Sequence, residues 1–169
     1  MTILTHATRN VYVPLILKEG LKLPSETGNC NWPEYSASDR ISFLLHPEET
    51  PFPKTSIGFN DFWYGERTGF FVDPDYLKDN LNNFEAEPAR EDIFQTFIKE
   101  LGIRTIKNPT KHEVPNEVVS FANIPVEGLY ALFHQSDSKS EINEIQKQAP
   151  AHIRLYSKQT DDLFYRRMK

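Results

Sequence analysis

Cysteine is almost absent from this chain. Cys30 is the only cysteine among 169 residues, which rules out a disulfide framework within the chain and a Cys-x-x-Cys metal pair. Long apolar runs are also missing, since none reaches the roughly 18 residues that a membrane-spanning helix needs. The N-terminus lacks the basic segment, hydrophobic core and cleavage site of a signal peptide. These absences favour a cytoplasmic protein without a membrane partner, or one exported by a route that needs no such signal.

An excess of positive charge is lacking as well. The formal net charge is −5 and the isoelectric point is near 5.5, which argues against nonspecific nucleic-acid binding, although an acidic protein can still carry a local basic groove. The histidines do not have the spacing of metal ligands, so no metal site is expected. They are His6, His46, His112, His134 and His152.

Aromatic residues, in contrast, are plentiful. The chain holds 12 Phe and 7 Tyr, and 38% of its residues are hydrophobic, which is enough to build the core of one globular domain spanning residues 1–169. Short β-rich patches alternate with irregular loops, without a regular β–α repeat. This pattern predicts an α+β fold.

The clearest local unit lies between Leu4 and Leu21. A β-compatible run places His6 and Thr8 on one face of a strand and Ala7 on the other. Asn10 then has the character of a helix N-cap, and Gly20 that of the residue that ends the helix. The predicted unit is therefore a strand, a turn and a short helix.

This unit resembles the opening of the ADP-ribosyltransferase fold, whose first strand carries His-x-Thr or His-x-Ser. The resemblance implies that His6 binds the nicotinamide-side ribose of NAD, with Thr8 beside it, and that the Ala7 backbone holds the nicotinamide amide. An imidazole and a hydroxyl on one strand face suit a polyhydroxyl ligand, because each donates and accepts hydrogen bonds. The alternative is a half-buried strand whose polar side chains are satisfied within the protein.

A second stretch, residues 64–73, resembles the glycine-rich turn and aromatic strand of the poly(ADP-ribose) polymerase branch. Phe70 and Phe71 stand in the predicted strand, and Pro74 is placed to start a helix that contains Tyr76. An aromatic ring is expected to stack on nicotinamide. Phe70, Phe71 and Tyr76 are the candidates, and the sequence does not choose between them.

The third stretch begins at Glu117. The pattern Glu-Val-Val-x-Phe-x-x-Ile-Pro-x-Glu resembles the late strand that opens with the catalytic Glu, as in DarT-type DNA transferases and RNA 2′-phosphotransferases. A carboxylate there stabilises the oxocarbenium character that develops when the nicotinamide–ribose bond breaks. The competing acid is Glu113, in a predicted loop, and the plainer reading of Glu117 is an exposed carboxylate at a strand start. RNA 2′-phosphotransferases use arginines around a phosphate, and near these motifs Arg9 and Arg67 are the evident candidates for that role.

The remaining predicted elements are helices at 87–101 and 141–148, a short helix from Pro125 to Leu132, and a terminal helix at 161–167. Predicted strands cover 41–45, 103–107, 116–121 and 153–156, and residues 55–64 form a strand or a packed loop. Residues 22–40 are expected to form a long loop.

Together the three motifs imply an ADP-ribosyltransferase-like fold: a split, mostly antiparallel sheet with a central NAD cleft and flanking helices. The implied enzyme transfers ADP-ribose from NAD to DNA, RNA or protein and releases nicotinamide, without a metal. A toxin or effector role with an antitoxin or immunity partner is part of the same expectation. The alternative is a noncatalytic interaction module with a binding patch of Trp32, Trp63 and Tyr64.

Overall fold

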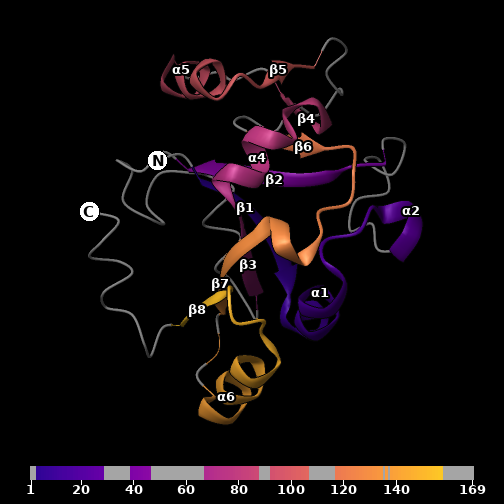
Figure 1. Cartoon of the computed structure of the whole chain (residues 1–169), viewed down its shortest axis with the longest axis vertical. Helices are drawn as coiled ribbons and strands as arrows, with labels where there is room; N and C mark the ends of the chain where they lie inside the picture. Colours follow the sequence, from indigo (N-terminus) through magenta and orange to yellow (C-terminus); the bar gives the residue numbers. More distant parts are fainter. Residues whose placement is uncertain are drawn as a thin grey trace.

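A computed structural model gives the arrangement of the chain (Figure 1). The structure describes residues 3–28, 39–46, 67–87, 92–106, 117–134, 136 and 138–157. Several predictions fall outside these residues: the elements at 55–64 and 161–167, the carboxylate of Glu113, and the patch of Trp32, Trp63 and Tyr64.

An eight-stranded sheet in the order β5-β4-β6-β2-β1-β3-β7-β8 organises the fold. Its strands are β1 (Ile3–Arg9), β2 (Ile41–His46), β3 (Arg67–Val72), β4 (Phe84–Ala86), β5 (Arg104–Thr105), β6 (Glu117–Ser120), β7 (Leu129–His134) and β8 (Arg154–Ser157). The two edge strands pair in parallel with their neighbours, and all other pairs are antiparallel. The predicted α+β class with a mostly antiparallel sheet is confirmed.

Short helices connect these strands. They are α1 (Val13–Glu19), α2 (Pro24–Thr27), α4 (Pro74–Asp79), α5 (Asp92–Leu101) and α6 (Lys139–Gln148), with 3-10 turns η1 (Asn10–Tyr12), η3 (Leu81–Asn83) and η4 (Val126–Gly128). α1 packs against α6, whereas α5 and β5 lie at the opposite end of the molecule (Figure 1).

One face of the sheet, here called the core face, carries the main hydrophobic core. Residues directly opposite each other on neighbouring strands share a face, so the register assigns His6 and Thr8 of β1 to the core face as well. Helix residues join the same core, among them Val13, Ile16 and Leu17 of α1. The strand residues at its centre are Leu4, Phe43, Phe70, Val118 and Leu132, all 1% exposed or less.

The end of α1 is fixed by a glycine, as the sequence predicts. Gly20 has φ 78°, and a β-carbon there would come within 2.2 Å of the carbonyl oxygen of Ile124. The next residue, Leu21, donates its N–H to that oxygen at 2.8 Å. Glycine therefore lets the end of α1 approach the segment before η4.

The start of this helix differs from the prediction. Asn10 is not its N-cap, because residues 10–12 form the turn η1 and Tyr12 caps α1. The side chain of Asn10 accepts a hydrogen bond from Thr68 at 2.8 Å instead. A tertiary contact with β3 thus outweighs the local capping preference.

Two other predictions are wrong because strand pairing overrides local helix signals. After Pro125 there is only the turn η4, and Leu129–His134 form β7, which is buried between β3 and β8. Of the predicted helix at 87–101, the described residues form α5 over Asp92–Leu101, whereas Glu87 lies outside a helix and directly follows the short strand β4. Tertiary pairing decides both segments.

The sheet divides between β1 and β2. These strands pair only from Ile3 to Thr5, whereas β1 continues along β3 as far as Arg9. Within the described residues, the β1 backbone beyond Thr5 has no ladder partner on its β2 side. The resulting opening between the two strands is called the fork, and it matches the split sheet that the resemblance implies.

Candidate active site

His6 stands at the point where the fork opens. If the β1–β2 register continued, the next residue, Ala7, would lie opposite Ser42. Instead, Nδ1 of His6 lies 2.9 Å from the Ser42 carbonyl oxygen, so the imidazole replaces a ladder hydrogen bond. A carbonyl only accepts, which makes Nδ1 the donor. Burial lowers the pKa of His6, with the hydrogen bond to Ser42 opposing this. The ring is neutral at pH 7, and its Nε2 is an acceptor.

The neighbours of His6 differ in their surroundings. Ala7 lies on the opposite face, which we call the second face, and is half-buried. Thr8 returns to the core face, directly opposite Thr68, and is only 8% exposed. His6 and Thr8 therefore share a face, as predicted. Of these two residues, only His6 lies where the fork opens.

Glu117 opens β6 and is 6% exposed. It lies opposite Leu44, which in turn lies opposite Thr5, so the side chain of Glu117 belongs to the second face. Its pKa is raised, first by burial and then by the negative charge of Glu87, while a hydrogen bond from Ser42 and the positive charge of Arg40 lower it. The Oε2 atom of Glu117 accepts no hydrogen bond from the described residues. Glu117 is not the exposed strand-start carboxylate of the plainer reading.

Arg40 and Glu87 lie beside Glu117 and are buried with it. We call these three charged residues the acidic cluster. Arg40 donates from one guanidinium nitrogen to Oε1 of Glu87 at 2.9 Å. The other terminal nitrogen lies 3.8 Å from Oε2 of Glu117, beyond hydrogen-bond distance. The cluster holds two carboxylates and one guanidinium, so one negative charge remains uncompensated within it when both acids are ionised.

Ser42 connects the two parts of the site. Its backbone carbonyl holds the His6 ring, and its hydroxyl is hydrogen-bonded to Glu117. His6 and Glu117 lie on opposite faces of the sheet, but both reach the same residue of β2. A ligand in the plane of the fork would meet side chains from both faces.

The three aromatic candidates lie in different environments. Phe70 is fully buried on the core face, and Phe71, 1% exposed, contacts the ring of Tyr130 on the second face. Tyr76 is in α4, where Asp73 caps the helix by accepting from the Tyr76 N–H at 3.0 Å. Tyr76 is the one of the three candidates that keeps a partly exposed side chain.

Sequence reasoning missed Arg40, Glu87 and Ser42 as members of the site. Arg40 stood at the end of a predicted loop, and Glu87 at the start of a predicted helix. One signal was available: Arg40 directly precedes an apolar run that is buried as β2. A charge joined to a buried strand needs a partner.

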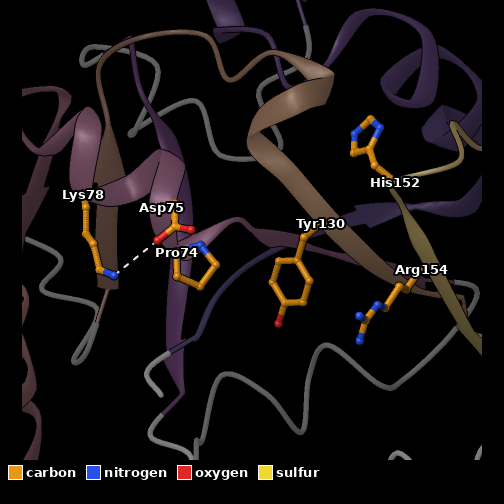
Figure 2. A pocket seen from close by; sticks show the side chains of 6 residues that line it. All are labelled: Pro74, Asp75, Lys78, Tyr130, His152 and Arg154. Atoms are coloured by element: carbon orange, nitrogen blue, oxygen red, sulfur yellow. Dashed lines mark hydrogen bonds and ion pairs between the residues drawn. The ribbon is translucent and has the colours of Figure 1, made fainter.

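A surface pocket of about 400 Å³ lies between α4, β7 and β8 (Figure 2). It is lined by Pro74, Asp75, Lys78, Tyr130, His152 and Arg154. Its charged side chains are exposed, and Lys78 pairs with Asp75 at 3.3 Å. Arg154 shares the second face with Glu117, but β7, β3, β1 and β2 separate the strands that carry them. This pocket lacks the buried, incompletely bonded groups of the acidic cluster.

Comparison with known proteins shows a similarity of fold to a solved structure. No protein-family model and no curated protein matches the chain. The solved structure of DarT from Thermus sp. 2.9, in complex with carba-NAD+, matches with a TM-score of 0.53 over 93% of this chain and 96% of that one. This chain has an ADP-ribosyltransferase-like fold. At 10% identity, the similarity extends to the fold and not to individual residues.

Two further features are absent from the described part of the chain. No helix there is both long and apolar enough to cross a membrane. The same residues contain no group of three or more His, Cys, Asp or Glu side chains placed to hold a metal ion.

Proposed function

We propose that this chain is an NAD-dependent ADP-ribosyltransferase that transfers ADP-ribose to a macromolecular acceptor and releases nicotinamide. The observation that supports this most is the buried carboxylate of Glu117, next to the fork of an ADP-ribosyltransferase-like sheet, with one oxygen that accepts no hydrogen bond from the part of the chain that the structure describes. A buried carboxylate with unused acceptor capacity is costly to keep. Binding of a substrate hydroxyl would supply the missing partner.

In this proposal the nicotinamide end of NAD lies in the fork. Nε2 of His6 accepts a hydrogen bond from a ribose hydroxyl, since its Nδ1 already donates to Ser42. The backbone edge of Ala7, unpaired on its β2 side within the described residues, binds the nicotinamide amide much as an added strand would. Thr8 stabilises this part of β1 from the core face.

Tyr76 is our choice for the ring that stacks on nicotinamide. Phe70 and Phe71 have almost no exposed surface, so neither offers a ring face to a ligand without displacement of its neighbours. Tyr76 is partly exposed, and it packs against the turn that contains Gly128, where a β-carbon would lie 3.0 Å from the Tyr76 ring. A ring supported on one side is well placed to bind a planar group.

Glu117 is the catalytic residue of the proposal. As the bond between nicotinamide and ribose breaks, positive charge develops on the sugar, and an ionised carboxylate held next to the 2′-hydroxyl stabilises it. Ser42 and Arg40 favour the ionised form of Glu117, against the cost of burial. When Glu117 is ionised, its negative charge therefore lies in a place where water screens it little.

The test is transfer from labelled NAD to separated protein, RNA and DNA fractions of a lysate. We expect label transfer by the native chain and a fall of about 10²–10³-fold in Glu117→Gln, which keeps the size of the side chain but loses about 3–4 kcal/mol of transition-state stabilisation. Glu127→Gln, at an exposed carboxylate of η4, is the matched control and should retain full activity.

Either of two results would contradict the proposal. Absence of transfer to all three fractions would favour the noncatalytic module. Retention of more than about a tenth of the native rate by Glu117→Gln, a loss below ~1.4 kcal/mol, would mean that another carboxylate carries the chemistry. Glu113→Gln is then the next variant to measure.

The biological setting remains part of the proposal. We infer a cytoplasmic toxin or effector that an antitoxin or immunity protein restrains, on the basis of the resemblance to DarT-type enzymes. Expression of the native chain should arrest growth of a bacterial host, and Glu117→Gln should not. Equal toxicity of both chains would contradict a role for transfer in the arrest.

A further inference from the structure

We propose that Glu87 is a positioning residue for Glu117: it anchors Arg40 so that the guanidinium lies beside the Glu117 carboxylate without occupying its Oε2 atom. This inference rests on the proposed function, in which Glu117 is catalytic. Glu87 itself is fully buried, and the proposal gives it no contact with NAD.

The distances within the acidic cluster are unequal in a way that supports this role. Arg40 lies 2.9 Å from Glu87 and 3.8 Å from Glu117. The closer contact is a hydrogen-bonded ion pair, and the farther one is a Coulombic contact only. Arg40 is thus committed to Glu87, while its charge still acts on Glu117.

The backbone fixes this arrangement. Glu87 follows β4 directly, and its N–H donates to the carbonyl oxygen of Glu117 at 2.9 Å. The two carboxylates therefore leave neighbouring positions of paired strands, on the same face. Arg40 precedes the first residue of β2, whereas Glu117 pairs with Leu44 farther along that strand. The Arg40 side chain therefore extends along the second face, past Ser42, to reach both acids. Glu117 opens β6, and Arg40 and Glu87 directly adjoin β2 and β4, so paired strands fix the positions of all three groups.

Removal of the Glu87 charge has a defined consequence. A buried guanidinium needs a carboxylate partner, and among the described residues the second carboxylate beside Arg40 is that of Glu117, at 3.8 Å. Arg40 would then bind Oε2 of Glu117, the atom that we assign to the substrate hydroxyl. Glu87 is therefore needed as the competitor that keeps Arg40 from blocking the catalytic carboxylate.

The other groups that face Glu117 do not substitute for Glu87. Ser42 already hydrogen-bonds to Glu117. Glu85 lies on the same face two residues before Glu87, but its carboxylate is 3.9 Å from Arg104 near the sheet edge. This makes Glu85 a suitable control, because it is an acid in the same segment and on the same face, with a different partner.

The test compares Glu87→Gln, Glu87→Asp and the control Glu85→Gln with the native chain. The ionisation of Glu117 is followed by carbon-13 NMR of the carboxyl groups, with its signal assigned by loss in Glu117→Gln. Transfer kinetics are measured over pH in parallel. In Glu87→Gln, we expect the Glu117 pKa to fall and kcat at the high-pH plateau to drop about tenfold, or ~1.4 kcal/mol, with KM for NAD within about threefold.

Glu87→Asp keeps the charge that anchors Arg40 and should retain most of the plateau kcat. The control Glu85→Gln should leave both the pKa of Glu117 and kcat close to the native values. An unchanged Glu117 pKa and kcat in Glu87→Gln would overturn the inference, as would a fall in kcat that Glu85→Gln reproduces. If Glu87→Gln does not fold, the test depends on Glu87→Asp. A folded Glu87→Asp variant whose kcat is no higher than that of Glu117→Gln would also overturn the inference. If the native chain transfers no ADP-ribose, the proposed function fails, while the NMR titration still decides whether Glu87 governs Arg40 and Glu117.

Discussion

Two polar groups, each centred on a buried side chain, lie on opposite faces of this sheet, and they differ in how completely their atoms are bonded. On the core face, a chain of hydrogen bonds, which we call the histidine network, joins Asn10, Thr68, His134, Glu141 and Ser136. His134 is fully buried, and both of its ring nitrogens have partners, at 2.7 and 3.0 Å. On the second face, the acidic cluster leaves one oxygen of Glu117 and one of Glu87 without a hydrogen bond from described residues.

The difference separates a stabilising group from a reactive one. A buried network whose members are all bonded rigidifies the protein. An unsatisfied buried carboxylate costs free energy and persists where another function requires it. Histidine, the residue type most often associated with catalysis, is structural at position 134, whereas the acid at position 117 is the candidate for chemistry.

The largest effect on stability is expected from the histidine network. His134→Ala should lower the free energy of unfolding by about 2–5 kcal/mol, because it leaves a cavity and removes a partner from buried Thr68. Urea denaturation measures this as a lower midpoint with an unchanged slope. The control is His152→Ala, at an exposed histidine, with an expected change within about 0.5 kcal/mol. A midpoint equal to that of the native chain would remove the distinction between the two groups.

Glu117→Gln should change stability less, and in the opposite direction. The raised pKa of Glu117 in the folded state means that folding favours its protonated form. Protonated Glu117 therefore adds to the free energy of unfolding at pH values below 4.5, the pKa of this group in the unfolded chain. This contribution is lost as the pH rises through the pKa of Glu117 in the folded chain. Gln does not titrate, so the variant should have the higher Tm near pH 8 and lose this advantage near pH 4. A lower Tm at pH 8 would show that the ionised carboxylate stabilises the fold.

The smallest effect concerns the pH dependence of transfer. Only ionised Glu117 supports the proposed chemistry, so the rate should rise with pH along a limb whose midpoint lies above 4.5. Ser42→Ala removes a hydrogen bond that lowers the pKa of Glu117 and should move this limb to higher pH. Ser120→Ala is the control, because that hydroxyl bonds to the backbone of Ala122. A limb that stays in place in Ser42→Ala would contradict the role of Ser42.

Local patterns in the sequence predict a large part of this fold. Alternation around His6 and the glycine at position 20 give β1 and the end of α1, and the β-branched run after Glu117 gives β6. The predicted helix at 141–148 also forms, and Ser138 caps it by accepting from the Glu141 N–H. In each case the signal lies within a few residues of the element that it specifies.

The missed features depend on residues far apart in the chain. β4 has only three residues, and it becomes a strand through pairing with β5 and β6. β7 carries apolar side chains on both faces, a pattern that a buried strand and a buried helix share. Arg40 and Glu87 acquire their roles from each other, 47 positions apart. No local pattern contains that information.

The position of β6 between β2 and β4 has a consequence for biosynthesis. A ribosome adds roughly 5–20 residues per second, so β2 and β4 emerge seconds before the strand that joins them. Until then each presents an open edge, a surface prone to pairing with another chain. The arrival of β6 closes both edges and delivers Glu117 in the same step. The growing chain therefore loses two open strand edges and acquires its candidate catalytic carboxylate at the same stage of synthesis.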